Sequence, residues 1–89
     1  MKQLLKDALK EINEDLELKE LENITDETAL FDILDSVAVL DLILEIEDRL
    51  QDKYGKYIQI ADDKTMDSQN TPFKTFASLV EYVEGKVNG

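Results

Sequence analysis

The sequence predicts an all-α fold, a small four-helix bundle made of three long helices, one short helix and a long first loop. Three stretches with apolar residues at helical spacing predict the long helices, and clusters of turn residues separate them. The chain has 89 residues, which is room for one core, so we expect a single domain spanning residues 1–89. Hydrophobic residues make up 43% of the chain, enough for a globular fold despite the high charge.

The first helix is predicted at about residues 2–16. Its apolar stripe consists of Leu5, Ala8 or Leu9, Ile12 and Leu16. Residues 17–35 have weaker periodicity and are predicted to form a long connection, in which we expect Phe31 to anchor the chain on the core. Long loops in small domains are usually held by their own apolar residues and are often functional.

The second long helix is predicted from Ser36 to Gln51 or Lys53, with Gly55 as the stop signal after Tyr54. Its apolar residues cover more than one stripe, so we expect this helix to lie at the centre of the bundle. Its solvent-exposed face is predicted to carry Asp41, Glu45, Glu47 and Asp48.

The chain after Gly55 is predicted to continue as an extended link, because residues 57–60 alternate like a strand that has no partner strand. A short helical turn is expected near residues 61–67. The last helix is predicted to begin near Pro72 or after Thr75 and to continue to about Gly85. Its inward stripe is predicted to be Phe76, Leu79, Val80 and Val83.

Composition narrows the classes of function. The chain has no cysteine and no histidine, which excludes disulfides, thiolate zinc sites and Ser-His or Cys-His catalysis. We therefore expect a protein that is not an enzyme. Asp62 and Asp63 begin no EF-hand, because neither frame supplies the required glycine or the terminal glutamate, and we expect no metal site.

The net charge is strongly negative. Ten Lys and Arg residues against twenty-one Asp and Glu residues give a formal charge of −11, which repels nucleic acid and anionic membranes and favours partners with basic patches. The first residues lack the apolar core of a signal peptide, and no apolar run is long enough to span a bilayer. We expect a cytoplasmic location and no stable membrane insertion.

Asp35 and Ser36 place a hydroxyl at the predicted start of the second long helix. Either residue could simply cap the helix, because both types accept orphan backbone N–H bonds there. A helix N-terminus also favours a phosphate esterified to the serine. Because no residue nearby could activate the hydroxyl, Ser36 is better explained as a site that another enzyme modifies than as a catalyst.

The stretch around this serine resembles the signature of acyl carrier proteins and related peptidyl carriers. In that family Asp-Ser followed by leucine or methionine opens an acidic, apolar-rich second helix. Residues 30–50, LFDILDSVAVLDLILEIEDRL, are similar to that pattern. The length, the first helix, the long loop, the Tyr54-Gly55 break and the ending at residues 75–83 also fit the family.

The resemblance implies specific roles. Ser36 would receive 4′-phosphopantetheine from coenzyme A through a separate phosphopantetheinyl transferase, and the thiol of the arm would hold a thioester. Asp35 would help the transferase and its metal ion to recognise the site. The resemblance also implies partner-binding roles for the apolar residues Val37 and Leu40 and for the acidic residues Asp41, Glu47 and Asp48. For the acidic residues, an ordinary solvated helix surface is the alternative. An interior cleft for an acyl chain would be lined by Leu42, Ile46, Ile58, Phe76 and Leu79, for which ordinary core packing is the alternative.

Several positions depart from the fatty-acid carriers. Ile33 and Leu34 stand where a glycine is common, Val37 replaces leucine, and Ala38 and Arg49 interrupt the acidic pattern. We therefore expect a specialised, free-standing, monomeric carrier of fatty-acid or polyketide biosynthesis, loaded and unloaded by enzymes with basic patches. One alternative is an aminoacyl carrier, either a D-alanyl carrier, which residues 34–36 and 70–72 resemble, or a peptidyl carrier. The other is an acidic helical interaction module without a prosthetic group.

Overall fold

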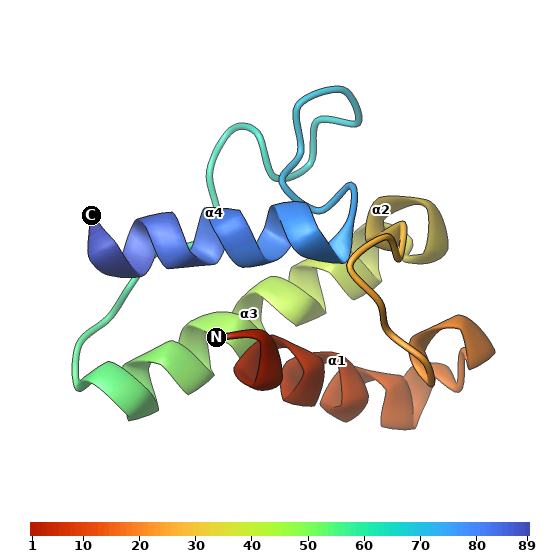
Figure 1. Cartoon of the computed structure of the whole chain (residues 1–89), viewed down its shortest axis with the longest axis horizontal. Coiled ribbons are helices and arrows are strands. Elements are labelled where there is room, and N and C mark those ends of the chain that lie inside the picture. Colours follow the sequence, from red (N-terminus) through yellow and green to blue (C-terminus); the bar gives the residue numbers. More distant parts are fainter.

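The computed structural model describes residues 1–89 and is entirely helical, without strands. Four α-helices and one 3₁₀ turn follow one another along the chain, and three of the helices are long and one is short, as predicted (Figure 1). Their bounds are α1 Lys2–Leu16, η1 Lys19–Leu21, α2 Leu30–Ile33, α3 Ser36–Tyr54 and α4 Phe76–Asn88. The sequence-based prediction of a small four-helix bundle is thereby confirmed.

Helix α1 buries Leu5, Ala8, Leu9 and Ile12 of the predicted stripe, while Leu16 at its end is only partly buried. It ends where Glu17 adopts a left-handed conformation (φ 55) and donates its N–H to the Asn13 carbonyl. The Asn13 side chain then holds Leu18 at both backbone groups, accepting its N–H at 2.7 Å and donating to its carbonyl at 3.1 Å. The Glu17 bond satisfies a carbonyl at the helix end, and the Asn13 side chain holds the backbone of Leu18 where the first loop begins.

Helix α3 is the central element. Its contact with α1 is the most extensive contact between any two helices of the structure. Its buried residues extend from Ala38 to Leu50. Gly55 ends it with φ 70, a backbone conformation that glycine adopts without a steric cost, and its N–H bonds the Gln51 carbonyl. The predicted stop at Gly55 is confirmed, and the helix reaches Tyr54, one residue beyond the predicted end.

Helix α4 begins after Thr75, which decides between the two predicted starts. The Thr75 hydroxyl accepts the Ser78 N–H, and the Ser78 hydroxyl accepts the Thr75 N–H, both at 3.1 Å. This reciprocal capping box satisfies two groups that would otherwise lack partners. The helix continues past Gly85 to Asn88, three residues beyond the predicted end.

The short helix lies elsewhere than predicted. Residues 61–67 form hydrogen-bonded turns and no helix, whereas α2 lies inside the segment predicted as a loop. Leu30, in α2, is fully buried, and the Phe31 N–H bonds the Phe73 carbonyl at 2.9 Å, so α2 is held by a contact from the far end of the chain. Phe31 itself is half-buried against the core, in agreement with its predicted role as an anchor.

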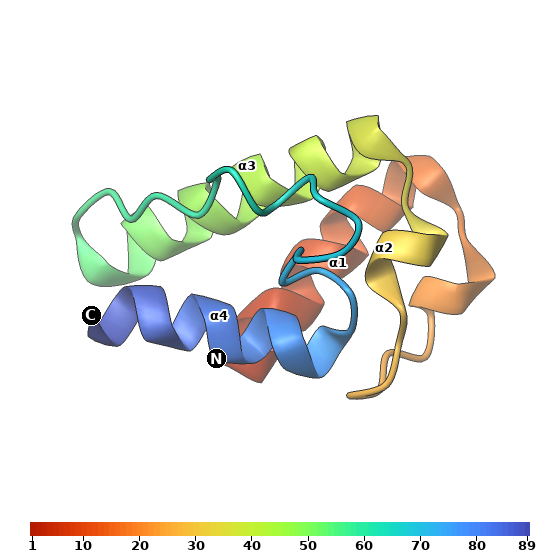
Figure 2. The ribbon, with the colours of Figure 1, turned by 90° about the horizontal axis from the view of Figure 1, so that it is seen from above.

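The core is one continuous cluster of 20 buried apolar residues drawn from α1, the first loop, α3, the connection after α3, and α4. Figure 2 shows that this connection runs back along α3 before it crosses to the start of α4. Ile58 and Ile60 from the connection belong to the core. One side of α3 is therefore covered by an extended segment, and α1 lies along another.

Candidate functional site

Ser36 is the first residue of α3, and it is exposed. The cap is made by Asp35, which has an extended backbone (φ −80, ψ 177) and accepts the Ala38 N–H at its Oδ1 at 2.8 Å. The Ser36 hydroxyl has no hydrogen-bond partner in the protein, and neither does the second carboxylate oxygen of Asp35. The capping function that either residue could have had is therefore performed by Asp35 alone.

The backbone around the hydroxyl is electropositive. The N–H groups of Ser36 and Val37 bond no other group of the protein, because Asp35 accepts only those of Ala38 and Val39. Free N–H groups at the start of a 19-residue helix carry the positive end of its dipole. This end of α3 can accommodate an anionic group bonded to Ser36 Oγ.

An apolar ridge continues from the serine along the exposed side of α3. Val37, Leu40 and Leu44 have exposed fractions of 67%, 49% and 64%, although leucine and valine are normally buried. Spacings of four residues place Ser36, Leu40 and Leu44 along one line of the helix surface. The ridge is therefore suited to contact with another molecule.

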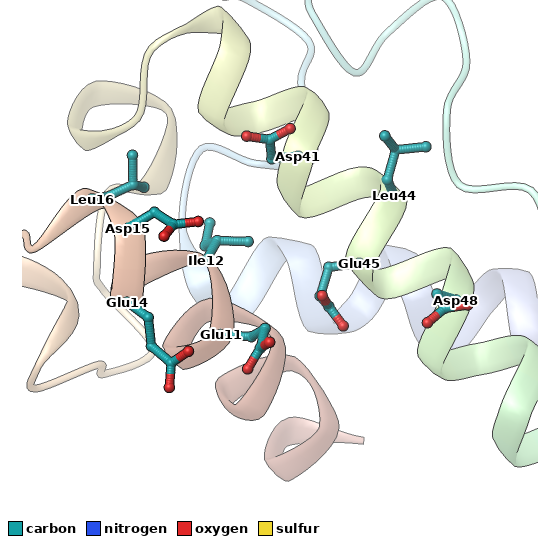
Figure 3. A pocket seen from close by; sticks show the side chains of 9 residues that line it. All are labelled: Glu11, Ile12, Glu14, Asp15, Leu16, Asp41, Leu44, Glu45 and Asp48. Atoms are coloured by element: carbon teal, nitrogen blue, oxygen red, sulfur yellow. The ribbon is translucent and has the colours of Figure 1, made fainter.

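An acidic groove of about 580 Å³ lies beside the ridge, between α1 and α3. Each helix contributes three carboxylates to its lining, and Figure 3 shows how they surround the groove. Of these six, only Glu45 has a cationic partner, Arg49 at 2.9 Å. The lining residues are Glu11, Ile12, Glu14, Asp15, Leu16, Asp41, Leu44, Glu45 and Asp48.

The groove attracts cationic groups, because unpaired carboxylates that face each other across a hollow concentrate a negative field. Two predicted partner-binding residues, Asp41 and Asp48, line it, so the structure places them where a partner could reach them. The sequence pattern did not identify the wall formed by α1. The sequence did indicate that Glu11 and Glu14 are exposed, because they lie off the apolar stripe of that helix. Residue spacing could not predict that this part of α1 lies beside α3.

Glu47 is not part of this surface, and its predicted exposure is wrong. It is 7% exposed, and its carboxylate accepts three hydrogen bonds from the segment after α3. Oε2 accepts the N–H groups of Ile60 at 2.8 Å and Ala61 at 3.2 Å, and Oε1 accepts the Tyr57 hydroxyl at 3.1 Å. An extended segment without a partner strand needs other acceptors for its backbone N–H groups. The predicted absence of a partner strand for residues 57–60 could therefore have indicated that a nearby carboxylate is buried.

The same segment is bound from α4. The Tyr82 hydroxyl lies 2.7 Å from both the Ile60 carbonyl and Asp62 Oδ2. Burial, and then the hydrogen bond to Asp62, raise the pKa of Tyr82 well above its ordinary value. The same bond lowers the pKa of Asp62, and the hydrogen bond to Glu47 raises the pKa of Tyr57. Asp62 is therefore held as a carboxylate and Tyr82 as a neutral phenol.

The five residues predicted to line an acyl-chain cleft lie together in the core. None is more than 8% exposed, and none lines any of the four surface hollows of the molecule. The structure thus shows packed side chains at these positions, and the cleft stays a prediction. They are Leu42, Ile46, Ile58, Phe76 and Leu79.

No group of three or more acidic side chains is arranged to hold a metal ion. None of the helices combines the length and the apolar character needed to cross a membrane. Comparison with protein-family models, with curated proteins and with solved structures found no match. Fold and site together define a small acidic helical protein with an exposed serine at a helix N-terminus, whose hydroxyl has no hydrogen-bond partner in the protein.

Proposed function

We propose that this chain is an acyl carrier protein, in which Ser36 carries 4′-phosphopantetheine. In the attachment step, a separate transferase would join Ser36 Oγ to the phosphate of the pantetheine arm of coenzyme A. Adenosine bisphosphate would leave, and the serine proton would pass to a base of the transferase. The arm supplies a thiol that holds an acyl group as a thioester, and the residues of the chain itself anchor and present that arm.

One observation carries the proposal: the Ser36 hydroxyl is exposed and has no structural task. Asp35 caps the helix, so the fold does not explain a serine at this position. The free N–H groups of Ser36 and Val37 would stabilise the negative charge of a phosphodiester at Oγ. The motif of residues 30–50 supports the same assignment.

The surroundings of the serine support a docking role. Val37 and Leu40 would make apolar contacts with the transferase and with later partner enzymes, while Asp41 and Asp48 would attract their basic patches. The free oxygen of Asp35 would be available to the transferase and its metal ion. Electrostatic attraction of this kind speeds encounters without requiring tight complexes, which suits a monomeric carrier that visits several enzymes in the cytoplasm.

The cargo defines the alternatives within this proposal. Departures from the fatty-acid carriers favour a specialised free-standing carrier of acyl chains, in fatty-acid or polyketide biosynthesis. An aminoacyl carrier, for D-alanine or a peptide, would use the same anchor and the same face. In both cases the arm raises the effective concentration of the bound intermediate at the partner's active site.

The groove between α1 and α3 favours a second candidate function. An acidic interaction module without a prosthetic group would use the same carboxylates to bind a basic partner, and Ser36 would remain unmodified. The modification of Ser36 therefore separates the two candidates.

The test is intact-mass measurement after incubation of the purified chain with coenzyme A, Mg²⁺ and a transferase of broad specificity. We expect one phosphopantetheine to be added to the wild-type chain and none to Ser36→Ala. Ser68→Ala is the matched control, because Ser68 is also exposed, makes no side-chain hydrogen bond and lies in a turn. It should be modified like the wild type.

The Ser36→Ala variant should remain folded, because the cap belongs to Asp35. Its urea unfolding free energy should stay within about 0.5 kcal/mol of wild type, as for other surface changes. A wild-type chain that gains no mass, or a gain that persists in Ser36→Ala, would contradict the carrier proposal and favour the interaction module.

A further inference from the structure

The segment from Lys56 to Ala61, called the strap below, covers the core beside α3. It runs back along the helix in an extended conformation (Figure 2). Its alternation is that of a strand: Ile58 and Ile60 are 8% and 0% exposed, while Tyr57 and Gln59 are exposed. The strap thus forms a wall of the core without belonging to a helix or a sheet.

No backbone group of the strap bonds another backbone group of the protein. Its attachment to the helices instead depends on two side chains. Glu47 on α3 accepts the Ile60 and Ala61 N–H groups, and Tyr82 on α4 donates to the Ile60 carbonyl. Ile60 is therefore held from both sides, by one helix at its N–H and by another at its carbonyl.

The α4 side of this attachment is reinforced at the next residue. The single hydroxyl proton of Tyr82 is shared between the Ile60 carbonyl and Asp62 Oδ2, and Lys86 lies 4.0 Å from the same Asp62 oxygen. The attachment is thus concentrated in a few groups, where a sheet would spread it along a ladder of backbone bonds.

We propose that the strap is a latched cover that opens as a unit while the helices stay folded, and that Glu47 and Tyr82 are the two halves of the latch. Opening breaks the bonds to these two side chains and exposes two isoleucines, whereas every helix keeps its internal bonds. Segments with few backbone bonds to the rest of a protein open at lower free energy than the core elements do. This inference does not depend on whether Ser36 carries an arm.

The experiment is amide hydrogen exchange of the unmodified chain, followed by NMR at several low urea concentrations. The Ile60 and Ala61 amides report opening of the strap, and the Leu9 and Ile12 amides in α1 report unfolding of the bundle. In the wild type we expect the strap amides to exchange faster and to depend less on urea, because opening exposes less surface than unfolding does. Identical rates and identical urea dependence at both places would overturn the proposal.

Two variants separate the latch from general stability. Tyr82→Phe keeps the ring but removes the bond to Ile60, and it should speed exchange of the Ile60 and Ala61 amides by about fivefold. Asp35→Ala weakens the cap of α3, so it should speed exchange at Leu9 and Ile12 by roughly fivefold and leave the strap amides unchanged. The proposal would also be overturned if Asp35→Ala raised the exchange rate of the strap amides, or if Tyr82→Phe left that rate unchanged.

Tyr54→Phe is the matched control for Tyr82→Phe. The Tyr54 hydroxyl is exposed and bonds nothing in the protein. Its removal should leave both sets of amides at their wild-type rates, and accelerated strap exchange in this variant would contradict the assignment of the latch to Tyr82.

Discussion

The two sides of α3 use the same kind of residue for opposite purposes. On the groove side, Asp48 is exposed and has no partner, while on the strap side its neighbour Glu47 is buried and accepts three hydrogen bonds. One step along an α-helix turns the side chain by about 100°, which is enough to move a carboxylate from one surface to the other. An acidic run along a helix therefore does not by itself mark an interaction face.

The difference comes from what each side packs against. The strap presents backbone N–H groups that have no strand to pair with, and a buried carboxylate satisfies them. On the other side, α1 presents further carboxylates to the acidic residues of α3. Those residues therefore stay accessible to solvent and to a positively charged partner. Substitutions on the two sides of α3 test this contrast.

The largest effect is expected from Glu47→Ala. Removing the carboxylate leaves the Ile60 and Ala61 N–H groups without acceptors in a largely buried place, so the free energy of unfolding should fall by about 3 kcal/mol. Urea denaturation followed by circular dichroism measures the loss.

Asp48→Ala is the matched control on the groove side. It removes an exposed carboxylate that has no partner, and alanine favours the helix, so the free energy of unfolding should change by less than about 0.5 kcal/mol. Similar losses in the two variants would mean that the two sides of α3 do not differ in the way described.

An intermediate effect, dependent on pH, is expected from Tyr82→Phe. The pKa of Tyr82 is raised in the folded chain, so the stabilisation by its hydroxyl is complete below the unfolded pKa of 10.0 and is lost as the pH rises above it. The pKa of Asp62 is lowered, so its contribution is complete above 3.8 and is lost as the pH falls below that value.

Wild type should therefore exceed Tyr82→Phe by about 1 kcal/mol in unfolding free energy near pH 7. The gap should narrow above pH 10 and below pH 4, because Tyr82 loses its proton and Asp62 gains one at those pH values in the unfolded chain, while the folded chain resists both changes. Urea titrations of both proteins across this range measure it. A gap that stays constant through pH 11 would show that the hydroxyl contributes nothing that depends on its protonation.

The smallest effect is expected in the groove. Asp41 lies one helical turn before Glu45, and like charges at this spacing repel. Asp41→Asn should raise the free energy of unfolding by about 0.5 kcal/mol at low ionic strength, and the gain should vanish at high salt. The control is Asp63→Asn, in an exposed turn outside the groove, which should show a smaller gain.

Equal gains in the two variants, or a gain in Asp41→Asn that salt does not reduce, would remove the electrostatic distinction of the groove. Thermal unfolding at two salt concentrations is sufficient for this comparison.

Local pattern predicted most of the fold. The stripe of α1, the start of α3 at Ser36 and the stop at Gly55 follow from spacing and from residue preferences that act within one or two turns. The position of the short helix was missed, because α2 is held by Phe73, more than forty residues away along the chain. The exposed Ser36 was identified from its neighbours, but only the structure showed that Asp35 alone makes the cap.

Local sequence is enough to specify three long helices and a serine at the N-terminus of one of them, because these features depend on interactions between residues close together in the chain. Tertiary structure alone decided which acids became structural and which stayed free. Glu47 and Asp48 are chemically alike and adjacent, and their difference arises from the strap on one side of α3 and α1 on the other. Burial depends on what a distant segment brings near, and local spacing does not encode that.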